Sequence, residues 1–443
     1  DEVFVRRVYL DVTGTLPTAG EARAFLGSDE AGKREALIDR LLGGEDYASY
    51  WTMKWCDVLR VKSEFPINLW PNAVQAYHRW LHDAVRENLP YDEFAWALLT
   101  RSGSNFREPP VNFYRAVQGR EPADLAKAAA LTFMGTRLET WPEDVRGGLE
   151  VFFSRVAFKR TGEWKEEIVY LDPTPVEAVS GVFPDGTRVD IGPGVDPRRL
   201  FAEWLTAPEN GWFARHAANR AWSWLFGRGL IHEPDDIRPD NPPVHPDVLE
   251  YLAEELVRAD FDLQHLIRLI LTSQTYQRSS IPQSEDPAAE AWFAHYPVRP
   301  LEAEVLIDAI CDLTGTTETY SSEIPEPFTY LPEHQRSIAL MDGSISSSFL
   351  ELFGRPPRDT GLASERNYHP TDAQRLHLLN SSHIQQKIER GPRLRLLTQN
   401  AKWKVPAEVR QLYLHVLSRP PTATELATAR AYLESAKQRR KQA

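Results

Sequence analysis

The chain has 443 residues, so at about 150 residues per domain we expect two or three domains and a large buried core. Its 13 tryptophans, 19 phenylalanines and 15 tyrosines supply enough apolar surface to exclude a disordered chain. The net charge of −12 argues against a nucleic-acid partner, because nucleic acids select cationic surfaces. No apolar run approaches the roughly 18 residues that a membrane-spanning helix needs, so we expect no membrane span.

Helical periodicity dominates the sequence and predicts a mainly α, multi-helical fold. The clearest start signal is Pro17 followed by the capping box Thr18-x-x-Glu21. Residues 1–166 are predicted to form an N-terminal helical domain, and residues 197–443 a C-terminal helical domain. In the first domain we expect helices over residues 18–26, 32–42, 51–60, 73–87, 94–99, 123–133 and 147–158. In the second we expect helices over residues 199–205, 212–226, 246–259, 263–272, 301–313, 373–380, 406–417 and 422–436.

Residues 167–196 interrupt the helical pattern. Residues 168–171 form a short run of β-forming side chains, and residues 181–189 alternate around an Asp185-Gly186 pair that is typical of a hairpin turn. Prolines bracket the segment on both sides. We therefore predict a small β insert or linker between the two helical domains.

The segment between residues 233 and 246 is the richest in polar side chains. It places three Asp, one Asn and one His in a loop stiffened by prolines, and such side chains can hold a hard cation or sugar hydroxyls. The spacing fits no EF-hand loop, however, and turn chemistry accounts for most of these residue types, which favours a structural role. With two residues of the preceding helix, the loop forms the candidate polar site: Asn219, Arg220, Asp235, Asp236, Arg238, Asp240, Asn241 and His245.

These carboxylates follow closely on an aromatic helix end that contains Trp222, Trp224 and Phe226. An isolated carboxylate among such side chains would be costly, whereas a bidentate arginine offsets the loss of water. We predict that Asp235 or Asp236 pairs with an arginine and ties the loop to this helix. The candidate arginines are Arg220, Arg228 and Arg238.

A second polar segment contains the residue types of a catalytic triad. Asp359, Ser364 and His369 could supply an acid, a nucleophile and a base, but no G-x-S-x-G elbow surrounds the serine. Triads are defined by geometry, so residue types alone assign no catalytic residue. Together with Glu365 and Arg366, these three residues are secondary site candidates.

Cys56 and Cys311 are the only cysteines. Two cysteines exclude a disulfide scaffold, a Cys-rich zinc site and an iron–sulfur cluster, and covalent haem is excluded because no C-x-x-C-H motif occurs. Both residues lie in apolar runs and are predicted to be small buried side chains. We therefore predict no metal site and no cofactor.

Several motifs together resemble two known families. Residues 5–18, 33–42 and 51–60 resemble the planctomycete cytochrome-associated domain of unknown function, the PSCyt-two family. The later chain is similar to the usual partner of that domain, the PSD-one family. The strings that carry this second resemblance are Phe213-Ala214-Arg215, Asn219-Arg220-x-Trp222, Phe226-Gly227-Arg228-Gly229-Leu230, Asp235-Asp236-x-Arg238, Asn241-Pro242-Pro243, His245-Pro246, Thr272-Ser273-x-Thr275-Tyr276-Gln277, Phe353-Gly354-Arg355-Pro356-Pro357-Arg358 and Leu417-Ser418-Arg419-Pro420-Pro421-Thr422.

The resemblance covers nearly the whole chain and implies an extracytoplasmic location, periplasmic or at the cell surface. These families are named for large extracytoplasmic proteins that often carry cytochrome c-like domains, and no biochemical activity is established for them. The resemblance therefore implies protein partners in an extracytoplasmic assembly. The sequence begins at Asp1 without an initiator methionine, and we expect a mature or trimmed form.

The chain departs from these families at two places where they carry cysteines. The families usually have a C-x-x-C-H-type segment after a phrase like residues 134–139, whereas here residues 140–146 contain neither Cys nor His. They also tend to show C-x-C before Glu-Arg, whereas here residues 361–364 precede Glu365-Arg366. Our hypothesis is that the two segments approach each other in the fold and served one haem or metal site that this chain has lost.

Three functions compete on this basis. We predict a non-catalytic extracytoplasmic scaffold or interaction protein without haem, because the ligands are missing and the polar clusters can pair with one another. The first alternative is a carbohydrate-active or other hydrolase that uses the Asp235–His245 loop, since abundant tryptophans can stack on sugar rings. A deep pocket lined by that loop and by exposed tryptophans would favour this alternative, and a buried, salt-bridged loop would count against it. The second alternative is an electron-transfer component, suggested by the families' context.

Overall fold

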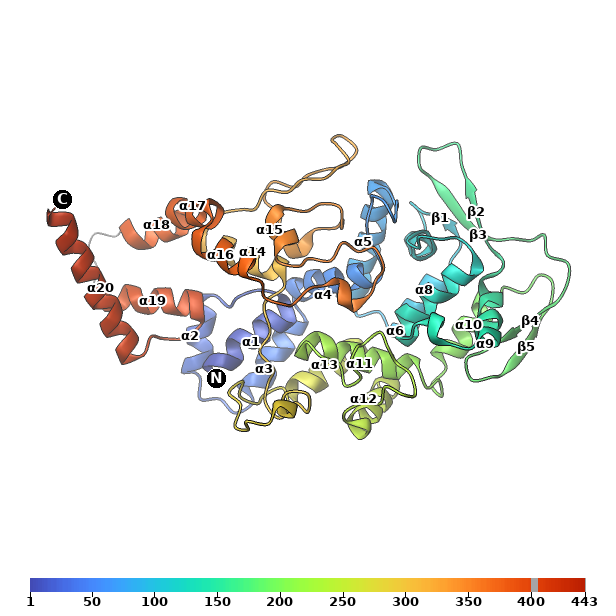
Figure 1. Ribbon diagram of the computed structural model, residues 1–443, viewed down its shortest axis with the longest axis horizontal. Coiled ribbons are helices and arrows are strands. Elements are labelled where there is room, and N and C mark those ends of the chain that lie inside the picture. Colours follow the sequence, from blue (N-terminus) through green and yellow to red (C-terminus); the bar gives the residue numbers. More distant parts are fainter. Residues whose placement is uncertain (400–404, 443) are drawn as a thin grey trace.

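The structure, a computed structural model, describes residues 1–399 and 405–442. Helices form most of it, and the strands form two small sheets, so the predicted mainly α, multi-helical class is confirmed (Figure 1).

The helices that precede the sheets are α1 (Glu2–Thr13), α2 (Ala19–Gly27), α3 (Lys33–Leu42), α4 (Glu45–Val58), α5 (Pro71–Arg86), α6 (Tyr91–Thr100), α7 (Asn112–Arg115), α8 (Pro122–Met134) and α9 (Glu143–Glu150). The strands are β1 (Gly103–Ser104), β2 (Val156–Arg160), β3 (Glu167–Leu171), β4 (Val179–Val182) and β5 (Arg188–Ile191). The later helices are α10 (Pro197–Thr206), α11 (Phe213–Phe226), α12 (Pro246–Arg258), α13 (Leu263–Thr272), α14 (Ala303–Thr314), α15 (Ser348–Leu352), α16 (Asp372–Asn380), α17 (Ser382–Arg390), α18 (Pro392–Gln399), α19 (Val405–Leu417) and α20 (Ala423–Gln442). The 3₁₀ helices are η1 (Pro109–Val111), η2 (Leu138–Thr140), η3 (Val151–Phe153), η4 (Pro287–Ala289), η5 (Ser337–Ala339) and η6 (Ala363–Glu365).

The helix start predicted at Thr18 has the expected geometry. The Glu21 N–H donates to Thr18 Oγ1 at 3.2 Å, and the Thr18 N–H donates to Glu21 Oε2 at 2.9 Å. The same reciprocal pair recurs between Thr422 and Glu425, at 2.8 and 3.2 Å. Each pair satisfies backbone donors that the first turn of a helix leaves without partners.

The predicted hairpin around Asp185-Gly186 is also present. β4 and β5 pair antiparallel with Val182 opposite Arg188, and Gly186 has a φ of 87°, which only glycine adopts at little cost. β3 lies between β1 and β2 in the other sheet. Neither sheet exceeds three strands within the described residues.

The helix predicted over residues 147–158 is wrong in its second half. α9 ends at Glu150, η3 follows, and β2 then pairs with β3 in a register that places Val156 opposite Leu171. A short apolar run does not distinguish a helix from a strand by its period, and here an available partner strand decides the outcome. The β region therefore begins before residue 167.

The largest core cluster contains buried residues from Phe4 to Ile338, so segments on both sides of the β region share it. Trp51 and Trp55 of α4 meet Trp224 of α11 edge to face, with ring centroids 5.5 and 5.3 Å apart. Figure 1 shows α4 near the middle of the molecule, with α11 and α13 on one side of it and α14 on the other. Aromatic pairs of this geometry contribute about 0.5–1.5 kcal/mol beyond the area that they bury.

A buried carboxylate of α1 holds a distant part of the chain. Asp11 accepts hydrogen bonds from the hydroxyls of Tyr276 and Tyr296 and from the guanidinium of Arg299, each at 2.8 Å. Arg7, one turn earlier, donates to the Tyr276 carbonyl at 2.6 Å. The first helix is therefore fixed to the segment between α13 and α14.

The C-terminal helices form the end of the molecule opposite the two sheets (Figure 1). A smaller core cluster joins α14, α15 and α17 through Ile307, Phe349 and Ile384. Beyond it, α19 packs against α2, where Ala22 and Leu414 are buried together.

Candidate functional site

The acidic loop between α11 and α12 is attached to the core through Asp235. Arg220 Nη2 of α11 donates to Asp235 Oδ1 at 2.6 Å. The exposed fractions of the two side chains are only 3% and 2%. Asp235 Oδ2 accepts the N–H of Ala363 at 2.5 Å, so the same carboxylate also holds the chain at η6. The predicted pairing of the loop with the helix that ends at Phe226 is confirmed.

Two further residues of α11 complete this buried polar cluster. Burial, together with the Arg220 guanidinium, lowers the pKa of His216 well below its ordinary value, so the imidazole is neutral. Its Nε2 can therefore accept the Arg220 Nε–H, 3.1 Å away. Asn219 bonds both backbone groups of Ile231, at 2.8 and 3.1 Å. The side chains of Asn219 and Arg220 are thus occupied in holding the start of the loop.

The other residues of the candidate polar site lie at the surface. Arg238 pairs with Asp236 at 3.1 Å and with Asp240 at 3.0 Å. The Asn241 side-chain amide donates to the carbonyls of Asp236 and His232. The loop therefore contains one buried carboxylate, that of Asp235, and a more exposed rim that includes Arg238 and Asp240.

His245 lies apart from that rim. It precedes α12, and its Nε2 is 3.2 Å from the Trp292 carbonyl. It lies at the far end of the loop and joins none of the ion pairs described above.

The secondary candidates do not form a triad. Asp359 pairs with Lys62 at 2.7 Å, and Glu365 accepts the N–H groups of Asp359 and Thr360. No hydrogen bond joins Ser364 to His369 in the part of the chain that the structure describes. The serine therefore lacks the general base that would activate it.

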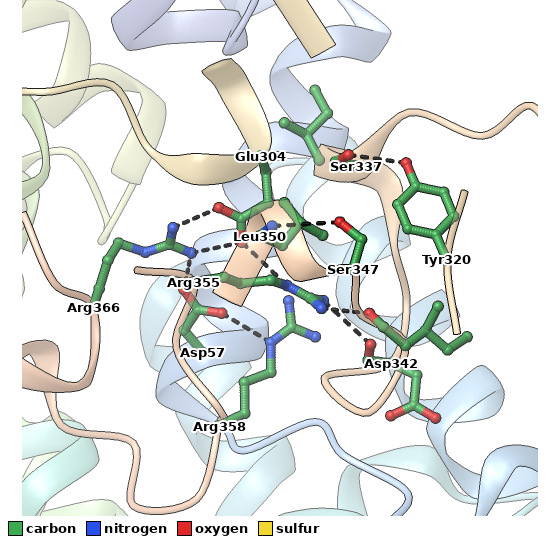
Figure 2. A network of polar contacts seen from close by, with 12 residues as sticks. Asp57, Glu304, Tyr320, Ser337, Asp342, Ser347, Leu350, Arg355, Arg358 and Arg366 are labelled. Carbon is green, nitrogen blue, oxygen red and sulfur yellow. Dashed lines mark hydrogen bonds and ion pairs between the residues drawn. The ribbon is translucent and has the colours of Figure 1, made fainter. Parts of the chain in front are cut away.

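Arg366, in contrast, belongs to a buried ion network that sequence reasoning missed (Figure 2). Its guanidinium contacts Asp57 of α4 at 2.6 Å and Glu304 of α14 at 2.6 Å. Asp57 also contacts Arg358 at 2.8 Å, and Glu304 contacts Arg355 at 3.3 Å. Glu304 is fully buried, so its charge depends on these two guanidinium groups.

A second buried pair lies beside this network. Lys54 Nζ of α4 is 2.6 Å from Glu302 Oε1, and the Tyr368 hydroxyl donates to the same oxygen at 3.1 Å. Burial alone would raise the pKa of Glu302, but Lys54 and Arg366 outweigh it and lower the pKa. For Lys54, burial lowers the pKa, and the opposing effect of Glu302 does not cancel this shift. The Lys54–Glu302 pair leaves little signal in the sequence, because its partners are 248 residues apart.

One cavity lies beside the segment, residues 361–364, that replaces the second cysteine motif of the families. Thr136 to Glu139, which precede the first segment, and Asp359, Thr360 and Leu362 line a cavity of about 400 Å³. Residues 140–146 are not among the lining residues, so the approach of the two segments and a former haem or metal site both stay predictions. No Cys or His lines the cavity, so its residues do not fit haem or a transition metal.

The two cysteines differ in their surroundings. Cys56 is buried in α4, as predicted, and burial raises the pKa of its thiol to about 12. Cys311 is only half-buried, and Lys387 Nζ lies 3.3 Å from its sulfur. Among the residues that the structure describes, no group of three or more His, Cys, Asp or Glu is arranged to hold a metal ion.

A further cavity lies between the acidic loop and the segment that follows α8. Its volume is about 680 Å³, and it is lined by Arg238, Asp240 and Asn241 together with Trp141 and Trp212. Sequence reasoning did not assign the two tryptophans to a site. Their abundance was the only signal, because the cavity depends on a contact between segments about 100 residues apart.

Comparison with known protein families agrees with this architecture. Residues 197–433, more than half of the chain, match the family described as PSD1, a protein of unknown function (DUF1553). The chain belongs to this family. Residues 1–139 match PSCyt2, a protein of unknown function (DUF1549), so the order of the two resemblances is confirmed. Comparisons with curated proteins and with solved structures found no match. Across the described residues, none of the helices combines the length and the apolar character that crossing a membrane requires.

The buried cluster around Asp235 generates a prediction at Gly135. Its φ is 61°, and a Cβ there would lie 2.4 Å from His216 Cδ2. We expect Gly135→Ala to lower the free energy of unfolding by about 3 kcal/mol, because it combines backbone strain with overpacking against His216. Gly147→Ala is the matched control, since its Cβ would meet no atom within 4 Å and should stabilise α9 slightly. Urea denaturation followed by circular dichroism measures both, and equal effects would contradict this account.

The lowered pKa of Glu302 gives a prediction of pH dependence. A carboxylate whose pKa is lower in the folded state adds stability above its unfolded pKa, here about 4.5, and loses it as the pH falls further. We expect Glu302→Gln to cost about 3 kcal/mol at neutral pH, because Lys54 stays buried without a counterion. The difference from wild type should shrink in acid below about pH 4.5. Urea titrations between neutral pH and about pH 3 measure it, with exposed Glu177→Gln as the control. A difference that grows in acid would be inconsistent with this assignment.

Proposed function

We propose that the protein is a non-catalytic extracytoplasmic binding protein, a scaffold or interaction component without haem in a cytochrome-associated family. The observation that carries this proposal is that the charged side chains of its motifs are already engaged with one another. Asp235, Arg220 and Arg366 each have buried ionic partners, and Asp359 and Glu365 hold neighbouring groups.

A hydrolase would need a reactive group that is free and accessible beside its activator. Asp235 is buried and paired, which counts against an acid–base role for it. Among the lining residues of the 680 Å³ cavity, Asp240 is the one carboxylate, and it pairs with Arg238. Glycoside hydrolysis generally uses two carboxyl groups across the scissile bond. These contacts support binding over hydrolysis.

An exposed group of aromatic side chains supports an interaction role. We name it the aromatic surface and define it by Trp70, Trp164 and Phe328, which come from three separate loops. The Trp70 ring centroid lies 6.3 Å from that of Trp164 and 5.8 Å from that of Phe328. Trp164 is 68% exposed, and Phe328 is 51% exposed. Trp164 lies in the connection between β2 and β3, a hairpin that projects from the body of the molecule in Figure 1.

Such a surface is costly in water unless a partner covers it. Lys165 lies over the Trp70 and Trp164 rings at 4.6 and 5.6 Å from their centroids, which adds a cation to the apolar patch. Aromatic residues are enriched at protein–protein interfaces whereas lysine is depleted there, so the aromatic rings and not Lys165 support the interaction role. The occupant that we propose is therefore a protein partner of the extracytoplasmic assembly.

Site-specific photo-crosslinking in the source cells tests this proposal. We expect a photoreactive phenylalanine at position 164 or 328 to give discrete adducts with the same partner, because both positions lie on the aromatic surface. The matched control is position 251, where Tyr251 is 49% exposed on α12 and lies outside that surface. The purified partner should bind a Trp164→Ser, Phe328→Ser variant at least tenfold more weakly than wild type. Identical adducts at all three positions, or undiminished binding by the variant, would refute the interaction role.

The non-catalytic part of the proposal has its own test. Purified protein should not turn over glycan or ester substrates above the rate of the buffer. Turnover that Asp236→Ala or His369→Ala abolishes, with the circular dichroism spectrum unchanged, would show that the protein is an enzyme.

A further inference from the structure

The 680 Å³ cavity beside the acidic loop has the size and lining of a ligand-binding site. We name it the tryptophan cleft and define it by Trp141, Trp212, Arg238, Asp240 and Asn241. Ligand pockets in proteins are typically about 300–1,000 Å³, with aromatic walls and a few polar groups that set the orientation. The cleft lies outside the buried ion pairs of Asp235 and Arg366.

Two half-buried indole rings form the apolar part of the cleft. The centroids of Trp141 and Trp212 lie 6.3 Å apart, with their planes inclined by 44°. Trp141 Nε1 donates to Thr136 Oγ1 at 2.9 Å, and Trp212 contacts the ring of Trp204 at 5.8 Å. These contacts fix both rings before any ligand arrives. Proline side chains supply much of the remaining wall: Pro142, Pro184, Pro239, Pro242 and Pro243.

The polar rim is also fixed in position. The Asn241 amide donates to two backbone carbonyls, and Ile237 N–H donates to the Gly135 carbonyl at 2.8 Å, which attaches the rim to the end of α8. Asp240 Oδ2 accepts from Arg238 at 3.0 Å. Asp240 Oδ1 and Asn241 Oδ1 accept no hydrogen bond from the described part of the chain. The rim therefore presents two acceptors that are open to donors of a ligand.

We infer that the tryptophan cleft binds a neutral oligosaccharide. A pyranose ring has an apolar face that can lie against an indole and hydroxyl groups that donate to carboxylate and amide oxygens. The lining offers the two Oδ1 acceptors together with donors, Trp212 Nε1 and Arg238 Nη2, which bond no group in the described chain. Sugar hydroxyls both donate and accept, whereas a proline-rich peptide offers mainly carbonyl acceptors and would leave the two oxygens without donors. An anionic ligand is disfavoured, because the lining arginines Arg215 and Arg238 already pair with carboxylates.

The inference rests on the proposed binding function and names the class of ligand. The single carboxylate of the cleft leaves the glycosidic bond without the acid–base pair that hydrolysis requires. Trp141 lies in the segment that stands in place of the families' C-x-x-C-H-type motif.

Isothermal titration calorimetry of the full chain tests the inference with cellohexaose, mannohexaose, xylohexaose and chitohexaose. We expect at least one of the four to bind, and Trp141→Ala and Trp212→Ala to weaken its binding at least tenfold. Asn241→Ala removes an acceptor of the rim and should weaken binding severalfold. The matched control is Trp164→Ala, which removes a more exposed tryptophan of the aromatic surface and should bind the oligosaccharide as wild type does.

Circular dichroism and thermal unfolding establish that each variant is folded. If either tryptophan variant fails to fold, Asp240→Ala and Asn241→Ala decide the matter, because both change the exposed rim. The inference is overturned if none of the four oligosaccharides binds, or if the cleft variants bind as tightly as wild type. Binding of a proline-rich decapeptide in their place, lost in Trp212→Ala, would also overturn it. Release of reducing ends from a bound oligosaccharide would instead refute the non-catalytic function while leaving the cleft as the binding site.

Discussion

The arrangement of this molecule depends on the ion pairs that the carboxylate of Asp57 forms with two arginines. The carboxylate projects from α4, the helix at the centre of the core, and accepts hydrogen bonds from Arg358 and Arg366, about 300 residues later in the chain. Arg366 also forms an ion pair with Glu304 and so links α4 to α14. The Asp57 side chain is only 18% exposed, so its carboxylate would be destabilising without such partners. These ion pairs therefore favour the path of the later chain that brings both guanidinium groups to α4.

The same principle operates at other places in the molecule. Asp11 fixes the segment between α13 and α14 to the first helix, and Asp235 fixes the acidic loop to α11 and to the chain at η6. Glu167 of β3 is held by Arg115 and Arg120 at 3.0 and 2.8 Å. Motifs rich in Asp and Arg suggest catalysis when they are seen in sequence alone. In this fold, most of these charged side chains pair with one another, often across long separations in sequence.

Because these charged side chains are paired, we assign the proposed function to surfaces that contain aromatic residues. The aromatic surface and the tryptophan cleft lie on different loops, and neither draws on the buried ion pairs. A rigid framework with fixed binding surfaces loses little conformational freedom when a ligand binds, which favours affinity. The two proposals together describe a protein that holds a glycan and a protein partner on separate surfaces.

Local chemistry made much of the fold predictable. The capping box at Thr18 and the turn at Asp185-Gly186 are specified within a few residues, and the Arg220–Asp235 pair joins positions only 15 residues apart. Strand β2 was missed because its apolar residues do not reveal their period without the partner strand. The partners of Asp57 were missed because contacts over 300 residues leave no local pattern. The segment around Trp141 carries no local signal of a cleft, because the cavity forms only where this segment meets the acidic loop about 100 residues later.

The central claim, that the motif charges hold the fold together, is tested most directly by a double-mutant cycle between Asp57 and Arg366. The free energies of unfolding of Asp57→Ala, Arg366→Ala and the double variant are measured in urea against wild type. We predict that each single substitution costs about 3–5 kcal/mol, and that the double variant costs less than the sum by at least about 2 kcal/mol. Charges kept for catalysis are commonly a burden on stability, so their removal leaves a protein equally or more stable. A single variant at least as stable as wild type, or purely additive losses, would contradict the account.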